Sequence, residues 1–157
     1  MSSLRVEIRA DSTIFAINGD ANVDFVAPIG DGSLTDEIIH SDPPRPEELT
    51  NAIGVMLDHL DDLLRERPEA AGARTSVAGT VAREIAAVEV GHAPDLPLTL
   101  SRDAVEDVFR TLATEASVDR ARNPGLSKSM VRTVVAGCCV TVAIMRRLHL
   151  DEIEVVA

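Results

Sequence analysis

The feature that most constrains the fold is an apolar segment near the end of the chain, residues 127–148, which predicts one long helix. Between Val134 and Met145 only Gly137 and Thr141 interrupt the apolar run. A helix that is hydrophobic on nearly all sides is buried in the centre of a domain. The run is shorter than the roughly 20 residues that a membrane span needs. We therefore expect a central buried helix, with Arg146 and Arg147 stabilising its negative end.

The segments before this helix predict one α/β domain that opens with strands. Three antiparallel strands are expected at residues 4–10, 13–18 and 23–27, with Asn18-Gly19-Asp20 as a hairpin-type turn. Helical spacing and capping signals predict an amphipathic helix from Pro46 to about Pro68, a short helix at residues 80–88 and a helix capped by Ser101. Further strands are expected at residues 74–78 and 153–156. This order indicates a mixed sheet of about five strands with helices on both faces.

Composition limits the partners of the domain. The 157 residues carry a formal charge of −11 at pH 7, which argues against binding nucleic acid, polyphosphate or an anionic membrane unaided. Residues 1–10 lack the basic start and apolar run of a signal peptide, so a cytoplasmic protein is expected. The two cysteines, Cys138 and Cys139, are expected to be buried thiols, and the four scattered histidines support no metal site.

Two turns hold the candidate site. The first is Val6-Glu7-Ile8-Arg9-Ala10-Asp11-Ser12-Thr13-Ile14-Phe15, in which a strand leads into a Ser-Thr pair. The second is Ser76-Val77-Ala78-Gly79-Thr80, where a strand meets the start of a helix. Glycine-rich turns in these settings bind phosphate through converging backbone N–H groups. Most of the glycines of such turns are absent here. We therefore interpret six residues of the two turns as a vestigial phosphate site: Arg9, Asp11, Ser12, Thr13, Gly79 and Thr80.

These turns resemble motifs of the exopolyphosphatase and guanosine-pentaphosphate phosphatase (Ppx/GppA) family. The family's first turn reads approximately Val-Asp-Ile-Gly-Gly-Gly-Ser-Thr-Glu-Phe, so three glycines are replaced here. Further matches follow in order: Pro28-Ile29-Gly30-Asp31-Gly32-Ser33-Leu34-Thr35-Asp36, Ser41-Asp42-Pro43-Pro44-Arg45-Pro46-Glu47-Glu48-Leu49, Leu100-Ser101-Arg102-Asp103-Ala104-Val105-Glu106, Asn123-Pro124-Gly125-Leu126-Ser127 and the last helix and strand. The resemblance implies a ribonuclease H-like (actin-like ATPase) fold and covers residues 1–157 as the family's second lobe.

The resemblance also implies what is missing. The matched residues include no counterpart of the first lobe, which supplies the family's catalytic carboxylate, and none of its C-terminal helical extension. We therefore expect no catalytic residue, no metal and no cofactor in this chain, which would act through protein contacts, most simply as a homodimer. Two alternatives remain: a regulatory module that binds phosphate, a nucleotide or polyphosphate, and an exopolyphosphatase completed in trans by a full-length Ppx/GppA relative, with Mg²⁺.

Overall fold

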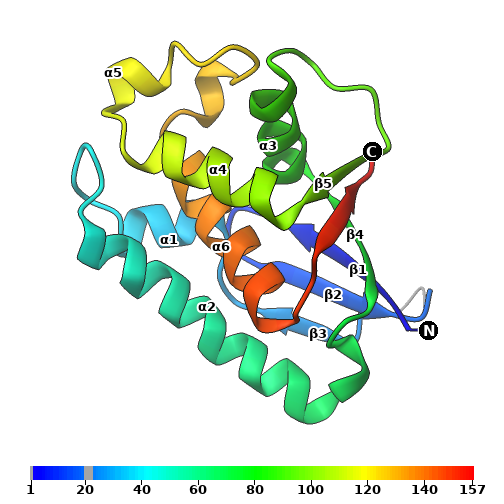
Figure 1. Ribbon diagram of the computed structural model, residues 1–157. Helices are drawn as coiled ribbons and strands as arrows, with labels where there is room; N and C mark the ends of the chain where they lie inside the picture. Colours follow the sequence, from blue (N-terminus) through cyan, green and yellow to red (C-terminus); the bar gives the residue numbers. More distant parts are fainter. Residues whose placement is uncertain (1, 20–22) are drawn as a thin grey trace.

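The computed structural model describes residues 2–19 and 23–157 and contains a six-stranded mixed sheet (Figure 1). The strand order is β3-β2-β1-β4-β6-β5. β1 runs antiparallel to β2 and parallel to β4, which is parallel to β6. The α/β fold class is confirmed. Part of the expected hairpin turn, Asp20, lies outside the described residues. The strands are β1 (Ser3–Ile8), β2 (Thr13–Ile17), β3 (Phe25–Ala27), β4 (Arg74–Ala78), β5 (Leu98–Ser101) and β6 (Glu152–Val155).

The sixth strand corrects the expected count of about five. Leu98 and Leu100 alternate with Thr99 and Ser101, and this short segment pairs antiparallel with β6. Ser101 ends the strand and also caps the following helix, because its hydroxyl accepts a hydrogen bond from the Ala104 N–H at 3.1 Å. The capping signal in the sequence was therefore interpreted correctly, whereas the four-residue strand before it was missed.

The last long helix is buried at the centre of the helical layer. It packs against four of the other helices, and every residue from Val134 to Met145 is buried. Val81 approaches so closely that a Cβ on Gly137 would lie 2.7 Å from its Cγ1. The predicted central helix is thus confirmed. The helices are α1 (Asp31–Glu37), α2 (Pro46–Glu66), α3 (Thr80–Val90), α4 (Arg102–Ala113), α5 (Ser117–Arg120) and α6 (Val134–Arg147).

The start of α6 differs from the prediction. The helix begins at Val134 and not near Ser127, and a short 3-10 turn, Lys128–Met130, precedes it. Two side chains from elsewhere hold this segment: Glu84 accepts a hydrogen bond from the Ser127 N–H at 2.7 Å, and Arg120 donates to the Val131 carbonyl at 2.9 Å. These tertiary contacts separate the segment from the helix that its apolar pattern predicts.

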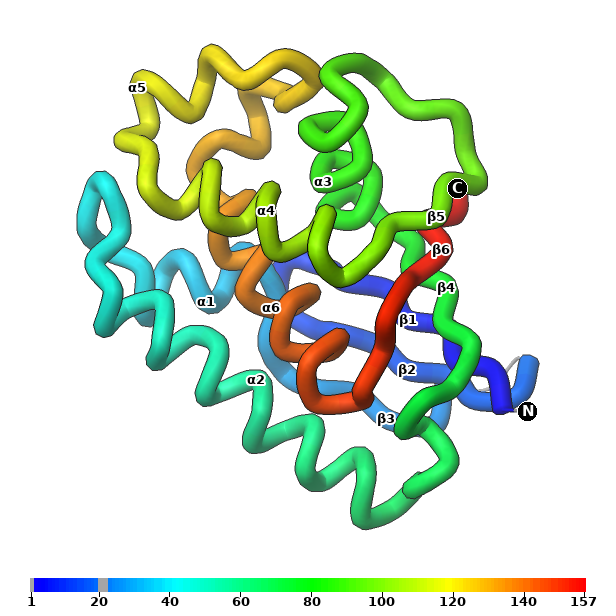
Figure 2. The backbone as a smooth tube through the Cα atoms, in the orientation of Figure 1, coloured from blue at the N-terminus to red at the C-terminus, as the bar shows by residue number. Residues whose placement is uncertain are grey.

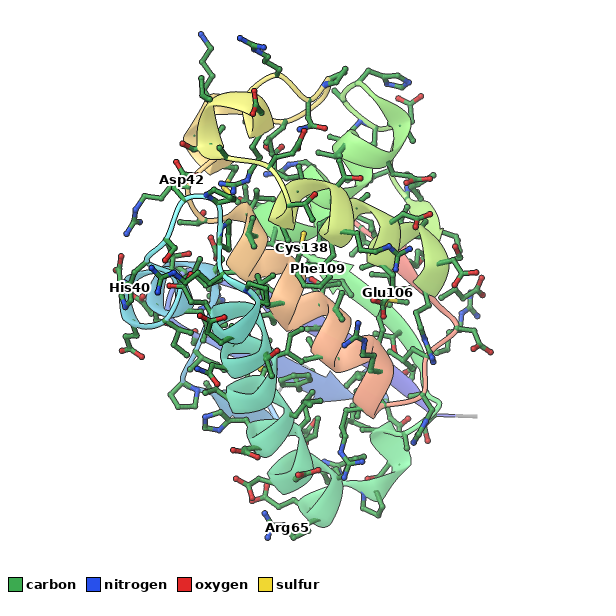
Figure 3. All side chains as sticks on the ribbon, turned by 60° about the vertical axis from the view of Figure 1, so that its left-hand side comes forward. His40, Asp42, Arg65, Glu106, Phe109 and Cys138 are labelled. Atoms are coloured by element: carbon green, nitrogen blue, oxygen red, sulfur yellow. The ribbon has the colours of Figure 1, made fainter. Side chains whose placement is uncertain are left out.

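The end of α6 is held by ion pairs to its neighbours. Arg146 donates two hydrogen bonds to Glu106 of α4, at 2.8 and 2.6 Å, and Arg147 pairs with Asp61 of α2. Figure 3 shows Glu106 on α4 beside this end of α6. The two arginines therefore join three helices, in addition to their favourable position at the negative end of the helix dipole.

The helices cover one face of the sheet, so the expected cover on both faces is not observed among the described residues. In Figure 2 the helical layer lies in front of the strands. Leu4, Val6 and Ile8 of β1 are buried beneath it, whereas Arg5 and Glu7, on the opposite face, are not. The same alternation continues across β4 and β6. The open face is polar and partly charged, which allows it to contact water.

Candidate functional site

The structure brings the two vestigial phosphate turns together at one edge of the sheet. β1 and β4 are parallel neighbours, with Glu7 opposite Ala78, so the turns that follow them leave the sheet side by side. A Cβ on Gly79 would lie 3.0 Å from the Ile8 carbonyl oxygen. The sequence motifs therefore correspond to a single location, as an anion site shared by two turns would require.

The first turn is closed by the start of α1. The N–H groups of Gly32 and Ser33 donate to the Ala10 carbonyl, at 2.8 and 3.0 Å. Gly30 lies so close that a Cβ there would be 1.8 Å from the Arg9 carbonyl oxygen. Within the turn, the Arg9 N–H donates to the Ser12 carbonyl at 2.8 Å. The N–H groups of Arg9, Gly32 and Ser33 are thus bonded to the protein itself.

The side chains of the first turn are also largely engaged. Thr13 is fully buried, and its hydroxyl donates to the Ile29 carbonyl at 2.9 Å. The Arg9 guanidinium pairs with Glu7 at 2.9 Å. Ser12 is partly exposed and Asp11 is exposed. Of the two hydroxyls and one guanidinium expected to contact phosphate, only the Ser12 hydroxyl makes no hydrogen bond within the described part of the chain.

Asp31 is a residue of this site that the sequence reasoning did not single out. It is the first residue of α1 and is 8% exposed. Burial raises the pKa of its carboxyl group, a hydrogen bond with Thr133 lowers it, and the nearby Asp11 charge raises it further. The available signal was the Gly30-Asp31-Gly32 sequence, in which two glycines allow close contact around one acid. A phosphate here would meet Asp11 and Asp31 together.

In the second turn, the backbone conformation at position 79 favours glycine. Gly79 has φ +104°, a conformation that favours glycine, and it is the N-cap residue of α3. Thr80 is the first residue within the helix, so Gly79 and not Thr80 occupies the capping position of α3. It is exposed, and its hydroxyl accepts a 3.5 Å hydrogen bond from Arg83. The Glu7 side chain lies beside Gly79 and brings a negative charge to the helix start.

The other candidate groups are structural. Cys138 and Cys139 are buried and form no disulfide, as expected. Burial raises the pKa of the Cys139 thiol to about 12 and that of Cys138 further, which keeps both protonated at neutral pH. Within residues 2–19 and 23–157, no group of three or more His, Cys, Asp or Glu side chains is arranged to hold a metal ion. Asp61 and Asp62 pair with arginines instead.

The basic cluster near Pro124 is divided by the fold. Arg120 is buried, whereas Arg122 is exposed and pairs with Asp119 at 4.0 Å. Lys128 is exposed and lies in a groove with Arg120. The fold therefore separates one buried cation from two exposed ones in the same segment.

Comparisons with known proteins agree with this architecture. No family model matches the chain. Exopolyphosphatase 1 of Mycobacterium tuberculosis is 26% identical over 88% of this chain and 42% of its own length, and the Mycobacterium leprae protein of that name is 24% identical over the same shares. The chain thus spans less than half the length of these curated relatives. No helix in the described ranges is long and apolar enough to cross a membrane.

Solved structures give the same result for the fold. The Aquifex aeolicus PPX-GPPA enzyme superposes with a TM-score of 0.86 at 19% identity, over 99% of this chain and 53% of that one. An exopolyphosphatase from Cytophaga hutchinsonii gives 0.84 at 16% identity, over 99% and 53%. The sheet and its helices therefore define an actin-like α/β lobe. Together with the sequence similarity, they confirm the resemblance that the motifs indicated: the chain is a Ppx/GppA-like lobe, corresponding to about half of such a protein.

Proposed function

We propose that this lobe does not hydrolyse polyphosphate or guanosine pentaphosphate by itself and acts through contacts with another protein. The observation that carries the proposal is the closed first turn, where the N–H groups of Gly32 and Ser33 donate to the Ala10 carbonyl. Phosphate transfer depends on donors that are already aimed at the developing charge. The N–H groups of Arg9, Gly32 and Ser33 are satisfied within the protein, so these donors cannot supply that stabilisation.

The charges around the turn support the same proposal. Glu7, Asp11 and Asp31 place three carboxyl groups near the position that a phosphate would occupy, against two cations: Arg9, which already pairs with Glu7, and Arg83, which donates to the Thr80 hydroxyl. Two like charges about 4 Å apart repel by roughly 1 to 4 kcal/mol, depending on the local dielectric. A polyanionic substrate would meet several such repulsions at once.

Hydrolysis is tested by measuring phosphate release from polyphosphate and guanosine pentaphosphate with Mg²⁺ present. We expect release at the level of buffer alone. Turnover that persists through repurification and is lost in Ser12→Ala would contradict the proposal. Release above that of a full-length relative alone, when this chain is added to it, would instead support completion in trans. A titration with pyrophosphate separates the remaining alternative, because saturable binding that is lost in Arg9→Ala or Thr80→Ala would identify an anion-sensing module.

The partner surface is not formed by α6. Residues 134–145 are buried, so α6 offers no apolar patch on the described surface. The open face of the sheet replaces it as the candidate. Central parallel strands are normally covered on both faces, and here β1, β4 and β6 have one uncovered face, which a partner of matching polarity would cover.

Charge favours a second copy of this chain as that partner. On the open face, Arg5 and Arg74 lie on β1 and β4, whereas Glu152 and Glu154 lie on β6. None of the four forms an ion pair with another described residue. A two-fold axis would bring Arg5 and Arg74 of one copy over the acidic strand of the other.

Light scattering at micromolar concentration tests the homodimer and should report about twice the 16.8 kDa chain mass. Arg5→Glu should give the monomer, and Arg5→Glu with Glu154→Arg should restore the dimer. Arg83→Glu, at an exposed position of α3, is the matched control and should leave the dimer unchanged. A wild-type protein that is monomeric at every concentration would reject self-association as the mode of contact.

A further inference from the structure

A groove beyond the far end of α1 lies apart from the two vestigial turns. It has a volume of about 570 Å³ and runs between the loop of residues 39–44 and the segment of residues 117–132. We call it the loop groove. Two hydrogen bonds join its walls, because Asp42 accepts from the Ser117 N–H at 2.7 Å and from its hydroxyl at 2.6 Å. Figure 3 shows His40 and Asp42 on the loop that forms one wall.

The opposite wall carries three cations in a chain whose formal charge is −11. Arg120 lies at the base, and Lys128 and Arg132 are exposed at the mouth. The acidic groups of the lining are already engaged: Asp42 holds Ser117, and Asp36 pairs with Arg132. Lys128 makes no ion pair with any residue in the described ranges.

Arg120 has an unusual environment for a buried cation. It is 4% exposed, and its guanidinium donates to the carbonyls of Leu112, Val131 and Glu115, at 3.0, 2.9 and 2.7 Å. These neutral acceptors use three of its five N–H donors. No carboxylate of the described residues lies within ion-pair distance of it. The C-terminal end of α4 offsets part of this charge, and an anion in the groove would offset more.

The lining also has an apolar part, formed by Ile39, Pro44, Val131 and Val135. Small-molecule sites typically combine an apolar lining with a few converging polar groups in clefts of about 300 to 1,000 Å³. The loop groove has that size and that combination. Its cations select an oxyanion, and its apolar side chains select an organic body attached to it.

From this combination we propose that the loop groove binds a small phosphate monoester, with the phosphate between Lys128 and the buried guanidinium of Arg120 and the organic body against Ile39 and Val131. Arg132 remains paired with Asp36 at the mouth. Arg and Lys are the usual partners of phosphate oxygens. The site is separate from the closed turn, so the proposal does not depend on whether that turn retains any affinity for phosphate.

Calorimetric titration tests the proposal with phenyl phosphate, inorganic phosphate and phenol as probes at constant ionic strength. We expect saturable binding of phenyl phosphate, weaker binding of inorganic phosphate and none of phenol. Lys128→Ala should weaken phenyl phosphate binding about tenfold, which corresponds to about 1.4 kcal/mol. Arg122→Ala is the matched control, because it removes one positive charge from the same segment outside the groove, and it should change the affinity less than twofold.

A second measurement uses the fact that Lys128 is the only lysine in the chain. Acetylation of Lys128 by a neutral reagent, followed by mass spectrometry, should slow when phenyl phosphate is present and should not slow with phenol. Absence of saturable binding, equal losses in Lys128→Ala and Arg122→Ala, or unprotected labelling would overturn the proposal. Binding lost in Arg9→Ala but kept in Lys128→Ala would also overturn it, and would place the anion at the first turn.

Discussion

The two ends of α1 have opposite surroundings. At its start, Gly30 and Gly32 allow the helix to press against the first turn, and the Ala10 carbonyl receives two of its N–H groups. Beyond its end, the chain turns away through residues 39–44, and the loop groove of about 570 Å³ remains. The comparison shows that the packing of neighbouring segments closes one end of α1 and leaves a groove beyond the other.

The strongest test of the closed turn is Gly30→Ala. The added Cβ would lie 1.8 Å from the Arg9 carbonyl oxygen, so α1 or the turn must move. We expect the free energy of unfolding to fall by about 3 kcal/mol, as in other overpacked sites. Denaturant unfolding measures the change. Gly54→Ala is the control, since an added Cβ would meet no atom within 4 Å beyond its chain neighbours and its own helix backbone, and it should stabilise α2 by about 0.5 to 1 kcal/mol. Equal effects of the two substitutions would show that the turn is not closed by contact.

A second test concerns the wall of the loop groove and its dependence on pH. The Glu48 carboxylate accepts hydrogen bonds from the N–H groups of His40 at 2.9 Å and Arg45 at 2.8 Å, and from Ser41. These bonds, led by that from Arg45, lower the pKa of Glu48 from 4.5. Glu48→Gln should therefore reduce the free energy of unfolding at pH 7 by about 1 to 2 kcal/mol.

The sign of this effect with pH follows from the lowered pKa. Stability from the Glu48 carboxylate is present above pH 4.5, the ordinary pKa, and is lost as the pH falls through the lower pKa of the folded state. The difference between wild type and Glu48→Gln should therefore shrink in unfolding measurements at progressively lower pH. Glu47→Gln, an exposed neighbour in the same first turn of α2, is the control. A difference that does not depend on pH would contradict the role of the charged carboxylate.

A smaller effect of opposite sign is expected at Asp31 beside the closed turn. Burial raises the pKa of Asp31 above 3.8, so its charged form opposes folding. Asp31→Asn should raise the free energy of unfolding at pH 7 by less than about 1 kcal/mol. The gain should disappear at a pH below 3.8, where the wild-type carboxyl group is protonated in both states. Urea unfolding at both pH values checks this, with exposed Asp95→Asn as the control; a loss of stability at pH 7 would contradict it.

The smallest expected effect is on hydrolysis. Replacing Arg9, Ala10 and Asp11 together by glycine should not produce multiple-turnover phosphate release, because Thr13 remains bonded to the Ile29 carbonyl and Asp31 remains in place. The assay uses polyphosphate with Mg²⁺ and wild type as reference. Repeated turnover by the triple variant alone would show that the three replaced glycines were the whole difference from an active turn.

Local patterns determined most of the fold. Alternating residues predicted β1, β2 and β4, helical spacing with Pro46 predicted α2, and the all-round apolar run predicted the buried α6. These elements follow from properties that lie within one segment: periodicity, caps and the need to bury apolar side chains. The ordered motifs also identified the correct type of lobe and placed Arg9, Thr13 and Gly79 at one site.

Tertiary structure alone decided whether that site is open. The sequence could not indicate that the Ala10 carbonyl accepts hydrogen bonds from residues 32 and 33, or that the Thr13 hydroxyl donates to the Ile29 carbonyl. Nor could it indicate that Arg120 is buried while Lys128 is exposed. It also predicted helices on both faces of the sheet, where the structure has them on one. Each of these features depends on contacts between segments that are distant in the chain. Composition and spacing do not indicate which distant segments come into contact.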